Sequence, residues 1–285
     1  MVQLLPPPIR LVIFDLDGVI YRGHRAVPGA PELVRDLQSR GLLVRYATNN
    51  STATRGAYVE RLTSLGIEAT IDELVTSTSA TIAYLHAHLP RVRRVLAVGA
   101  AGMLDELRQA GFPATAAADA APGHYHGGPL PERYDAVIAG LDQEFDYQRL
   151  ATAASAIREG ALFIATNADL RYPTPHGFLP GAGAMVAAIQ AAAGAEPPLV
   201  IGKPEPAMFV TALEETGVPA DEAVVVGDNP DADMVAAARA GIRSVLVLTG
   251  VTDASGAAQL DGDRRPDAVA AGPSELGRLL DAWLR

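Results

Sequence analysis

The sequence predicts an α/β fold: a parallel β-sheet with helices on both faces, interrupted by a second, inserted α/β domain. Short β-branched apolar runs alternate with longer Ala- and Leu-rich stretches, which is the pattern of strand–helix units. The middle of the chain repeats this alternation as a separate series. With 285 residues, the chain is long enough for two domains of ordinary size.

The first block begins with a buried strand and continues with alternating helices and strands. Its strands are predicted at 11–14 and 42–47, and its helices at 31–40 and 52–66. The first helix has Pro31 near its start and Gly41 just past its end, the usual asymmetry of helix termini.

The middle and last blocks complete the pattern. The middle block is predicted to have strands at 92–99, 135–140 and 161–166, helices at 103–110 and 147–159, and a loop at 114–131. The last block is predicted to have strands at 199–202, 223–227 and 244–248 and a helix at 231–241. We therefore expect a core domain of residues 1–89 plus 197–285 and an inserted domain of residues 90–196.

Composition excludes several classes of protein. The net charge of −10 and the lack of a Lys/Arg-rich block argue against nucleic-acid binding. The absence of cysteine excludes disulfides, thiolate metal sites and cysteine nucleophiles. No apolar run is long enough to span a membrane. Residues 1–10 are too short and proline-rich for a signal peptide, so we expect a cytoplasmic protein.

Acidic side chains follow two of the predicted strands. Asp15 and Asp17 come directly after the first strand, two residues apart, and therefore point to the same side of an extended chain. Asp228 and Asp233 follow the strand at 223–227, and we assign Asp231 between them to capping of the next helix. Ligands bind at the carboxyl ends of parallel strands, and clustered carboxylates suit a hard cation such as Mg²⁺.

Two further strand ends carry groups that suit a phosphate. Thr48, Asn49 and Asn50 offer a hydroxyl and amides at a strand-to-helix turn, where the helix dipole favours an anion. Lys203, between glycine and proline after the strand at 199–202, can neutralise phosphate charge. Each of these signals is weak when taken alone.

Together, the motifs Asp15-Leu16-Asp17-Gly18-Val19, Thr48-Asn49-Asn50-Ser51, Gly202-Lys203-Pro204 and Gly227-Asp228 resemble those of the haloacid dehalogenase superfamily, in its NagD-type sugar-phosphatase and p-nitrophenylphosphatase branch. The resemblance covers essentially the whole chain. It implies a Rossmann-like core, a large α/β cap and a Mg²⁺-dependent phosphatase acting on small phosphorylated metabolites through an aspartyl-phosphate.

The resemblance also implies a role for each matching residue. Asp15 matches the nucleophile and a metal ligand, and Asp17 matches the general acid/base, whose carbonyl also binds the metal. Thr48 and Asn49 match the residues that hydrogen-bond the phosphoryl group, and Lys203 matches the charge-neutralising lysine. Asp228 matches a carboxylate metal ligand, and Asp233 an acid that reaches the metal directly or through water. One departure is Ala232, which stands where many relatives carry a hydroxyl.

In the inserted domain, the stretch 165–183 resembles the substrate-facing cap segment. Its candidates for substrate contact are Asp169, Arg171, Tyr172 and His176. The pair His124 and His126 lacks an evident third metal ligand. The substrate stays open, and so does the oligomeric state; a homodimer would agree with the general preference for two-fold symmetry.

Two alternatives stay open. A phosphosugar mutase would use the same aspartates, and a non-catalytic phosphometabolite-binding protein would bind without turnover. A dehalogenase would need neither Asp17 nor the acids around Asp228.

Overall fold

The computed structural model describes residues 7–120, 129–174 and 177–284. The chain divides into two compact units. Unit 1 comprises residues 1–48, 55–75 and 203–285, and unit 2 comprises residues 49–54 and 76–202. The predicted domain boundaries, 89/90 and 196/197, differ from this division, because residues 49–54, 76–89 and 197–202 group with unit 2.

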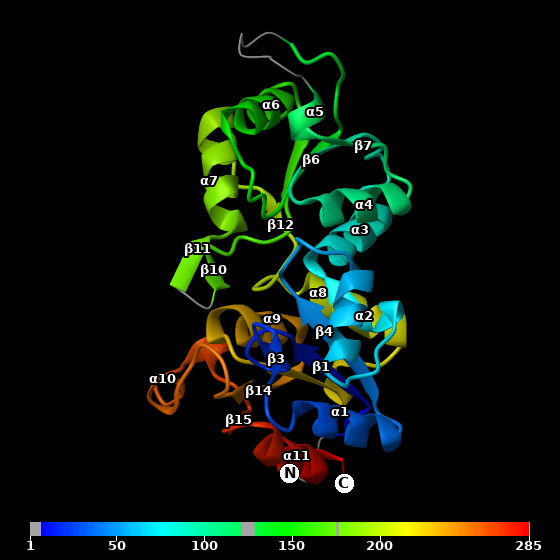
Figure 1. Ribbon diagram of the computed structural model, residues 1–285, viewed down its shortest axis with the longest axis vertical. Helices are drawn as coiled ribbons and strands as arrows, with labels where there is room; N and C mark the ends of the chain where they lie inside the picture. The colour runs from blue at the N-terminus through cyan, green and yellow to red at the C-terminus, as the bar shows by residue number, and fades with distance from the viewer. Residues whose placement is uncertain (1–6, 121–128, 175–176, 285) are drawn as a thin grey trace, which may run out of the picture. The chain divides into compact units, whose positions relative to one another are not determined.

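Unit 1 is built on a six-stranded sheet in the order β15-β14-β13-β1-β4-β5 (Figure 1). Its strands are β1 Leu11–Asp15, β4 Leu43–Thr48, β5 Leu74–Thr76, β13 Ala223–Gly227, β14 Arg243–Val247 and β15 Ala268–Ala270. β1 pairs in parallel with both β4 and β13, and every residue of β1 and β13 is buried. Strands buried on both faces read as continuous apolar runs, which is why the sequence reveals them.

Helices and a small hairpin complete unit 1. The helices are α1 Ala30–Ser39, α2 Arg55–Ser64, α8 Ala207–Thr216, α9 Val235–Ala240, α10 Ala254–Ala257 and α11 Pro273–Trp283. Strands β2 Tyr21–Arg22 and β3 Arg25–Ala26 form an antiparallel hairpin directly after β1. The helix predicted at 231–241 begins as a π-helical turn, Pro230–Met234, and continues as α9.

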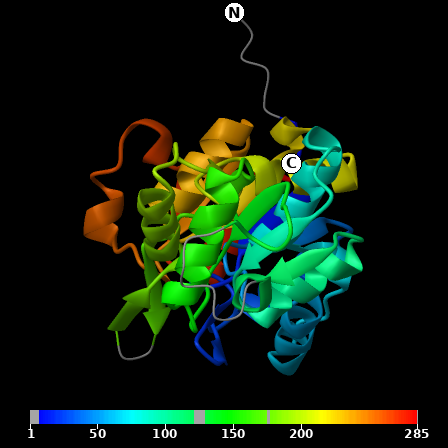
Figure 2. The same ribbon diagram turned by 90° about the horizontal axis from the view of Figure 1, so that it is seen from above.

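Unit 2 has a five-stranded parallel sheet in the order β12-β9-β8-β6-β7. Its strands are β6 Val95–Val98, β7 Ala114–Ala116, β8 Ala136–Ala139, β9 Leu162–Ala165 and β12 Leu199–Val200. Its helices are α3 Ser77–His88, α4 Ala101–Gln109, α5 Ala117–Ala120, α6 Tyr147–Arg158 and α7 Ala182–Ala193. A hairpin of β10 Arg171–Thr174 and β11 Gly177–Pro180 projects from this unit in both views (Figures 1 and 2).

The predicted α/β class with a parallel-sheet core and a further α/β region is confirmed. The prediction of a loop at 114–131 is wrong at its start, because β7 and α5 occupy residues 114–120. β7 pairs in parallel with β6, and these tertiary hydrogen bonds override the weak strand propensity of an Ala-rich segment. No helix in the described part of the chain is long and apolar enough to cross a bilayer.

Candidate active site

Asp15 is the last residue of β1, and Asp17 lies two residues further on in the turn that leaves the sheet. Asp15 is buried and Asp17 is half-buried. Gly18 makes this turn possible: its φ of 81° favours glycine, and an added Cβ would overlap the Asp228 carboxylate. The Gly18 amide donates to the Tyr21 carbonyl at 2.8 Å, which ties the turn to the β2–β3 hairpin.

Asp228 and Asp233 come from the loop that follows β13. The Val251 amide donates to Asp228 Oδ2 at 2.7 Å. Asp233 Oδ2 accepts the amides of Asp228 at 3.2 Å and Asn229 at 3.1 Å, so the π-helical turn directs its side chain back to the strand end. Backbone donors thus hold both carboxylates in fixed orientations.

The capping role predicted for Asp231 is wrong. The N-cap is Asn229, whose side-chain oxygen accepts the Asp231 amide at 3.1 Å. Asp231 itself is exposed, and its nearest described cation is Arg264 at 3.8 Å. The side-chain oxygen of Asn229 caps the turn as well as an aspartate oxygen would, and the sequence offers no means to choose between neighbouring capping residues.

Lys203 joins the two acidic segments. Its Nζ donates to Asp15 Oδ1 at 2.5 Å and to Asp233 Oδ1 at 2.7 Å, with the Ala47 carbonyl at 3.4 Å. The Lys203 side chain is only 4% exposed. Burial acts to lower the pKa of Lys203, but the carboxylates of Asp15 and Asp233 outweigh it and raise this pKa above its ordinary value. The lysine is therefore a permanent cation at the carboxyl edge of the sheet.

One ammonium does not neutralise the carboxylates gathered here. Oxygens of Asp15, Asp228 and Asp233 lie within 4.8 Å of one another, and all three residues are buried. Burial and the neighbouring Asp233 raise the pKa of Asp228 to about 7. Burial also raises the pKa of Asp15 well above its usual range, although Lys203 opposes it. This excess of buried negative charge, presented as oxygen donors, suits a hard divalent cation.

Thr48 ends β4 in unit 1 and is buried. Unit 1 thus holds six of the predicted site residues: Asp15, Asp17, Thr48, Lys203, Asp228 and Asp233. The strand-end rule brings together side chains that are more than 200 residues apart in the chain.

The remaining predicted residues belong to unit 2. The Asn49 side-chain amide donates to Asp169 Oδ2 at 3.0 Å, and Asn50 Oδ1 accepts the Thr52 amide at 2.9 Å and the Thr52 hydroxyl at 2.7 Å. Both asparagine side chains thus form hydrogen bonds within unit 2, and the phosphate-binding prediction did not foresee these bonds.

The other cap candidates lie around the β10–β11 hairpin. The Arg171 guanidinium lies 5.6 Å from the ring centre of Phe178, across the hairpin, and Tyr172 is half-buried. His176, and with it His124 and His126, lies outside the described residues.

Two features of unit 1 escaped the sequence prediction. The first is the segment Thr249–Val251, in which the Thr249 hydroxyl donates to the Gly18 carbonyl at 2.7 Å and Gly250 packs on Asp228. The second is the pair Tyr21 and Arg61, which packs beside Asp17. A glycine two residues after a predicted strand was the only available signal for the first feature.

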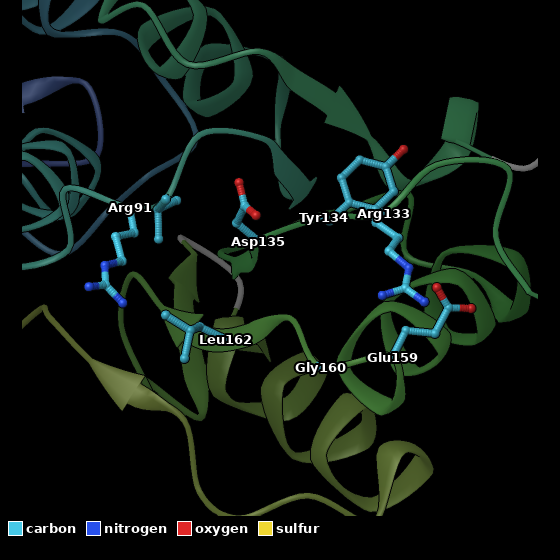
Figure 3. Close-up of a pocket in the computed structure, with 8 residues that line it drawn as sticks. Arg91, Arg133, Tyr134, Asp135, Glu159, Gly160 and Leu162 are labelled. Atoms are coloured by element: carbon cyan, nitrogen blue, oxygen red, sulfur yellow. The ribbon is translucent and has the colours of Figure 1, made fainter.

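One cavity has no residue of this site in its lining. It has a volume of about 320 Å³ and lies in unit 2, where Arg91, Arg133, Asp135, Glu159 and Leu162 line it (Figure 3). Asp135 precedes β8 and Leu162 begins β9, so the cavity is at the amino ends of parallel strands. The Asp135 carboxylate also accepts hydrogen bonds from the backbone amides of Arg93 and Arg94, both at 2.8 Å. The carboxyl ends are the usual ligand sites, so we do not assign catalysis to this cavity.

Comparison with known proteins identifies the family. A model described as haloacid dehalogenase-like hydrolase matches residues 12–113, and a second HAD-hydrolase-like model matches residues 200–276. An acid sugar phosphatase of Staphylococcus aureus is 35% identical over 240 residues, which cover 84% of this chain and 86% of that protein.

Solved structures agree with this result. The 4-nitrophenylphosphatase from Thermotoga maritima superposes with a TM-score of 0.83 at 30% identity, covering 95% of this chain and 97% of that one. A glycerol phosphate phosphatase from Mycobacterium tuberculosis, in complex with magnesium, gives a TM-score of 0.83 at 34% identity, covering 95% of this chain and 77% of that one. The chain therefore belongs to the haloacid dehalogenase superfamily, in its NagD-type branch, and is a phosphoric monoester hydrolase.

Proposed function

We propose that this phosphatase hydrolyses small phosphorylated metabolites in a Mg²⁺-dependent reaction, with Asp15 as the nucleophile. The observation that carries the proposal is the group of buried carboxylates, Asp15, Asp228 and Asp233, around the single ammonium of Lys203. Such a group binds a phosphate dianion only if a cation offsets its negative charge.

The donor set indicates which residues would hold that cation. Asp15 and Asp228 would supply carboxylate oxygens, the Asp17 carbonyl would supply a third oxygen, and Asp233 would bind directly or through water. When bound, Mg²⁺ would neutralise charge on the phosphate and so reduce its repulsion of the nucleophile. Asp233 is already engaged by Lys203 and two amides, which favours the water-mediated contact.

In the first step, Asp15 attacks phosphorus in line with the leaving oxygen. An Asp15 Oδ–P bond forms, the bond from phosphorus to the ester oxygen breaks, and the departing oxygen takes a proton from Asp17. Lys203 stabilises the negative charge from a fixed position, and fixed charge of this kind needs no reorganisation during the reaction. Thr48 and Asn49 are proposed to donate hydrogen bonds to the phosphoryl oxygens.

In the second step, water attacks the phosphorus of the aspartyl-phosphate. Asp17, now ionised, accepts the proton of that water, and the bond between phosphorus and Asp15 breaks to release phosphate. For the first step Asp17 must be protonated. Burial raises the pKa of Asp17, while the charges of Arg61 and Lys203 oppose that shift.

We propose unit 2 as the cap that selects the substrate, with Asp169, Arg171, Tyr172 and His176 as its contact residues. Relatives named for sugar phosphates, nitrophenyl phosphate and glycerol phosphate support a small monoester. We propose Asn50 as a further residue that contacts the substrate.

The test is phosphate release from p-nitrophenyl phosphate by the purified protein, with Mg²⁺ and with excess EDTA, beside Asp15→Asn. We expect release that requires Mg²⁺ and that the variant lacks. Free inorganic phosphate as the product, without transfer to an added sugar, separates hydrolysis from a mutase. Wild-type release by folded Asp15→Asn contradicts the proposed nucleophile.

A further inference from the structure

A tyrosine and an arginine that the mechanism does not use lie beside Asp17. Tyr21 begins β2, and its ring is completely buried. Arg61 comes from the last turn of α2, and its guanidinium carbon lies 3.8 Å from the centre of the Tyr21 ring. An Arg61 amino group also donates to the carbonyl of Gly23, in the turn between β2 and β3. One side chain thus holds both the base and the tip of the hairpin.

The hairpin is in turn connected to Asp17. Residues 17 and 21 form an isolated β-bridge, and the Gly18 amide donates to the Tyr21 carbonyl at 2.8 Å. The buried Tyr21 hydroxyl has no hydrogen-bond partner of good geometry among the described residues. Any shift of Tyr21 would therefore reach the backbone of Asp17 and Gly18, and with it the point from which the Asp17 side chain extends.

Arg61 suits this task better than another cation would. Its planar guanidinium can stack on the tyrosine ring while an N–H group reaches the carbonyl, whereas an ammonium is a point charge on a flexible stem. Arg61 is half-buried, and its Nε is enclosed without a hydrogen-bond partner in the described residues. The stacking and the Gly23 contact therefore account for its position, and no carboxylate within the described ranges forms an ion pair with it.

We propose that Arg61 is a positioning residue for proton transfer: by clamping Tyr21 and the β2–β3 hairpin, it holds the Asp17 carboxyl group in line with the leaving oxygen. The inference rests on the proposed role of Asp17. Small displacements of a reacting group can cost about 100-fold in rate, so loss of the clamp lowers catalysis without removing any group that touches the substrate.

The test compares two leaving groups. p-Nitrophenolate leaves without protonation, whereas an alkoxide is strongly basic and needs a proton from Asp17. We would measure kcat/KM for p-nitrophenyl phosphate and for an alkyl monoester that the wild type hydrolyses. For Arg61→Met we expect the alkyl-to-aryl ratio of kcat/KM to fall by about 10-fold or more, within the range that general acids contribute. Arg61→Lys retains the charge and should give an intermediate ratio.

The matched control is Arg35→Met. Arg35 is an exposed arginine on α1 that contacts the exposed Glu32 and the Pro31 carbonyl of its own helix. The alkyl-to-aryl ratio of Arg35→Met should therefore equal that of the wild type. Circular dichroism and the urea midpoint of each variant report whether it is folded. Should Arg61→Met unfold, the ratio for Arg61→Lys decides.

An equal fall for both esters means that Arg61 only supports the fold, and an unchanged ratio means that Asp17 needs no clamp; either result overturns the inference. Asp17→Asn separates this failure from a failure of the mechanism. If Asp17→Asn leaves the ratio unchanged, the proton-transfer role of Asp17 is itself wrong.

Discussion

Replacing Lys203 with methionine tests the charge balance of the site. In the folded chain, the Lys203 ammonium lies 2.5 Å from Asp15 and 2.7 Å from Asp233, and the three side chains are 4%, 11% and 2% exposed. Removing one partner from a buried ion pair typically costs about 3–5 kcal/mol, because the remaining charge is left without compensation. Protonation of the freed carboxylates moderates the cost, so we expect the lower end of that range near neutral pH.

The assay is urea unfolding of metal-free protein in EDTA, followed by tryptophan fluorescence. Trp283 is the single tryptophan and lies in α11 of unit 1, the unit that contains Lys203. Arg239→Met is the matched control, because the Arg239–Glu205 pair is 41% and 43% exposed and such pairs contribute at most about 1 kcal/mol. Asp233→Asn combined with Lys203→Met should recover part of the loss. If Lys203→Met costs no more than Arg239→Met, the reasoning about buried charge is refuted.

Three further results are expected. In EDTA, Asp228 should lower the free energy of unfolding by at most about 4 kcal/mol between about pH 4 and pH 7. Its pKa is raised from 3.8 to about 7 in the folded state, which therefore keeps a proton that the unfolded chain has lost. A slope of stability against pH that Asp228→Asn leaves unchanged would contradict this. Gly250→Ala should raise the Mg²⁺ concentration for half-maximal activity by about 10-fold or more, because the added Cβ would overlap the Asp228 carboxylate. The control is Gly256→Ala, whose added Cβ meets only ordinary contacts and which should therefore behave as wild type. Asp17→Asn should lower kcat for p-nitrophenyl phosphate by about 100-fold or more through loss of general base catalysis, and wild-type turnover would exclude that role.

The sequence predicted the strands of both sheets best where burial leaves a strong signal. β1 and β13 are fully buried and read as unbroken apolar runs, so their ends, and with them Asp15 and Asp228, could be located within a residue. β7 was missed because its Ala-Thr-Ala sequence carries little strand preference, and its pairing with β6 depends on a neighbour about 20 residues away. Elements that depend on tertiary contacts give no comparable local signal.

Within the site, residue types were predictable but their partners were not. The strand-end rule indicates that Lys203 and Asp15 approach one another, yet the bond from Lys203 to Asp233 depends on the π-helical turn, which no sequence period indicates. The contact of Asn49 with Asp169 spans 120 residues. Arg61 was read only as part of a helix, since its function depends on the hairpin that it meets in the folded chain.

The most direct test of the account is chemical capture of the intermediate on Asp15. The protein is mixed with Mg²⁺ and p-nitrophenyl phosphate, quenched in acid during turnover, and treated with borohydride, which reduces an acyl phosphate to the alcohol. Peptide mass spectrometry should find the side chain of residue 15 reduced to homoserine, with Asp17, Asp228 and Asp233 unchanged. The modification should be absent when Mg²⁺ or the ester is omitted. Reduction at another aspartate, or full turnover with no reduced residue at any quench time, would contradict nucleophilic catalysis by Asp15.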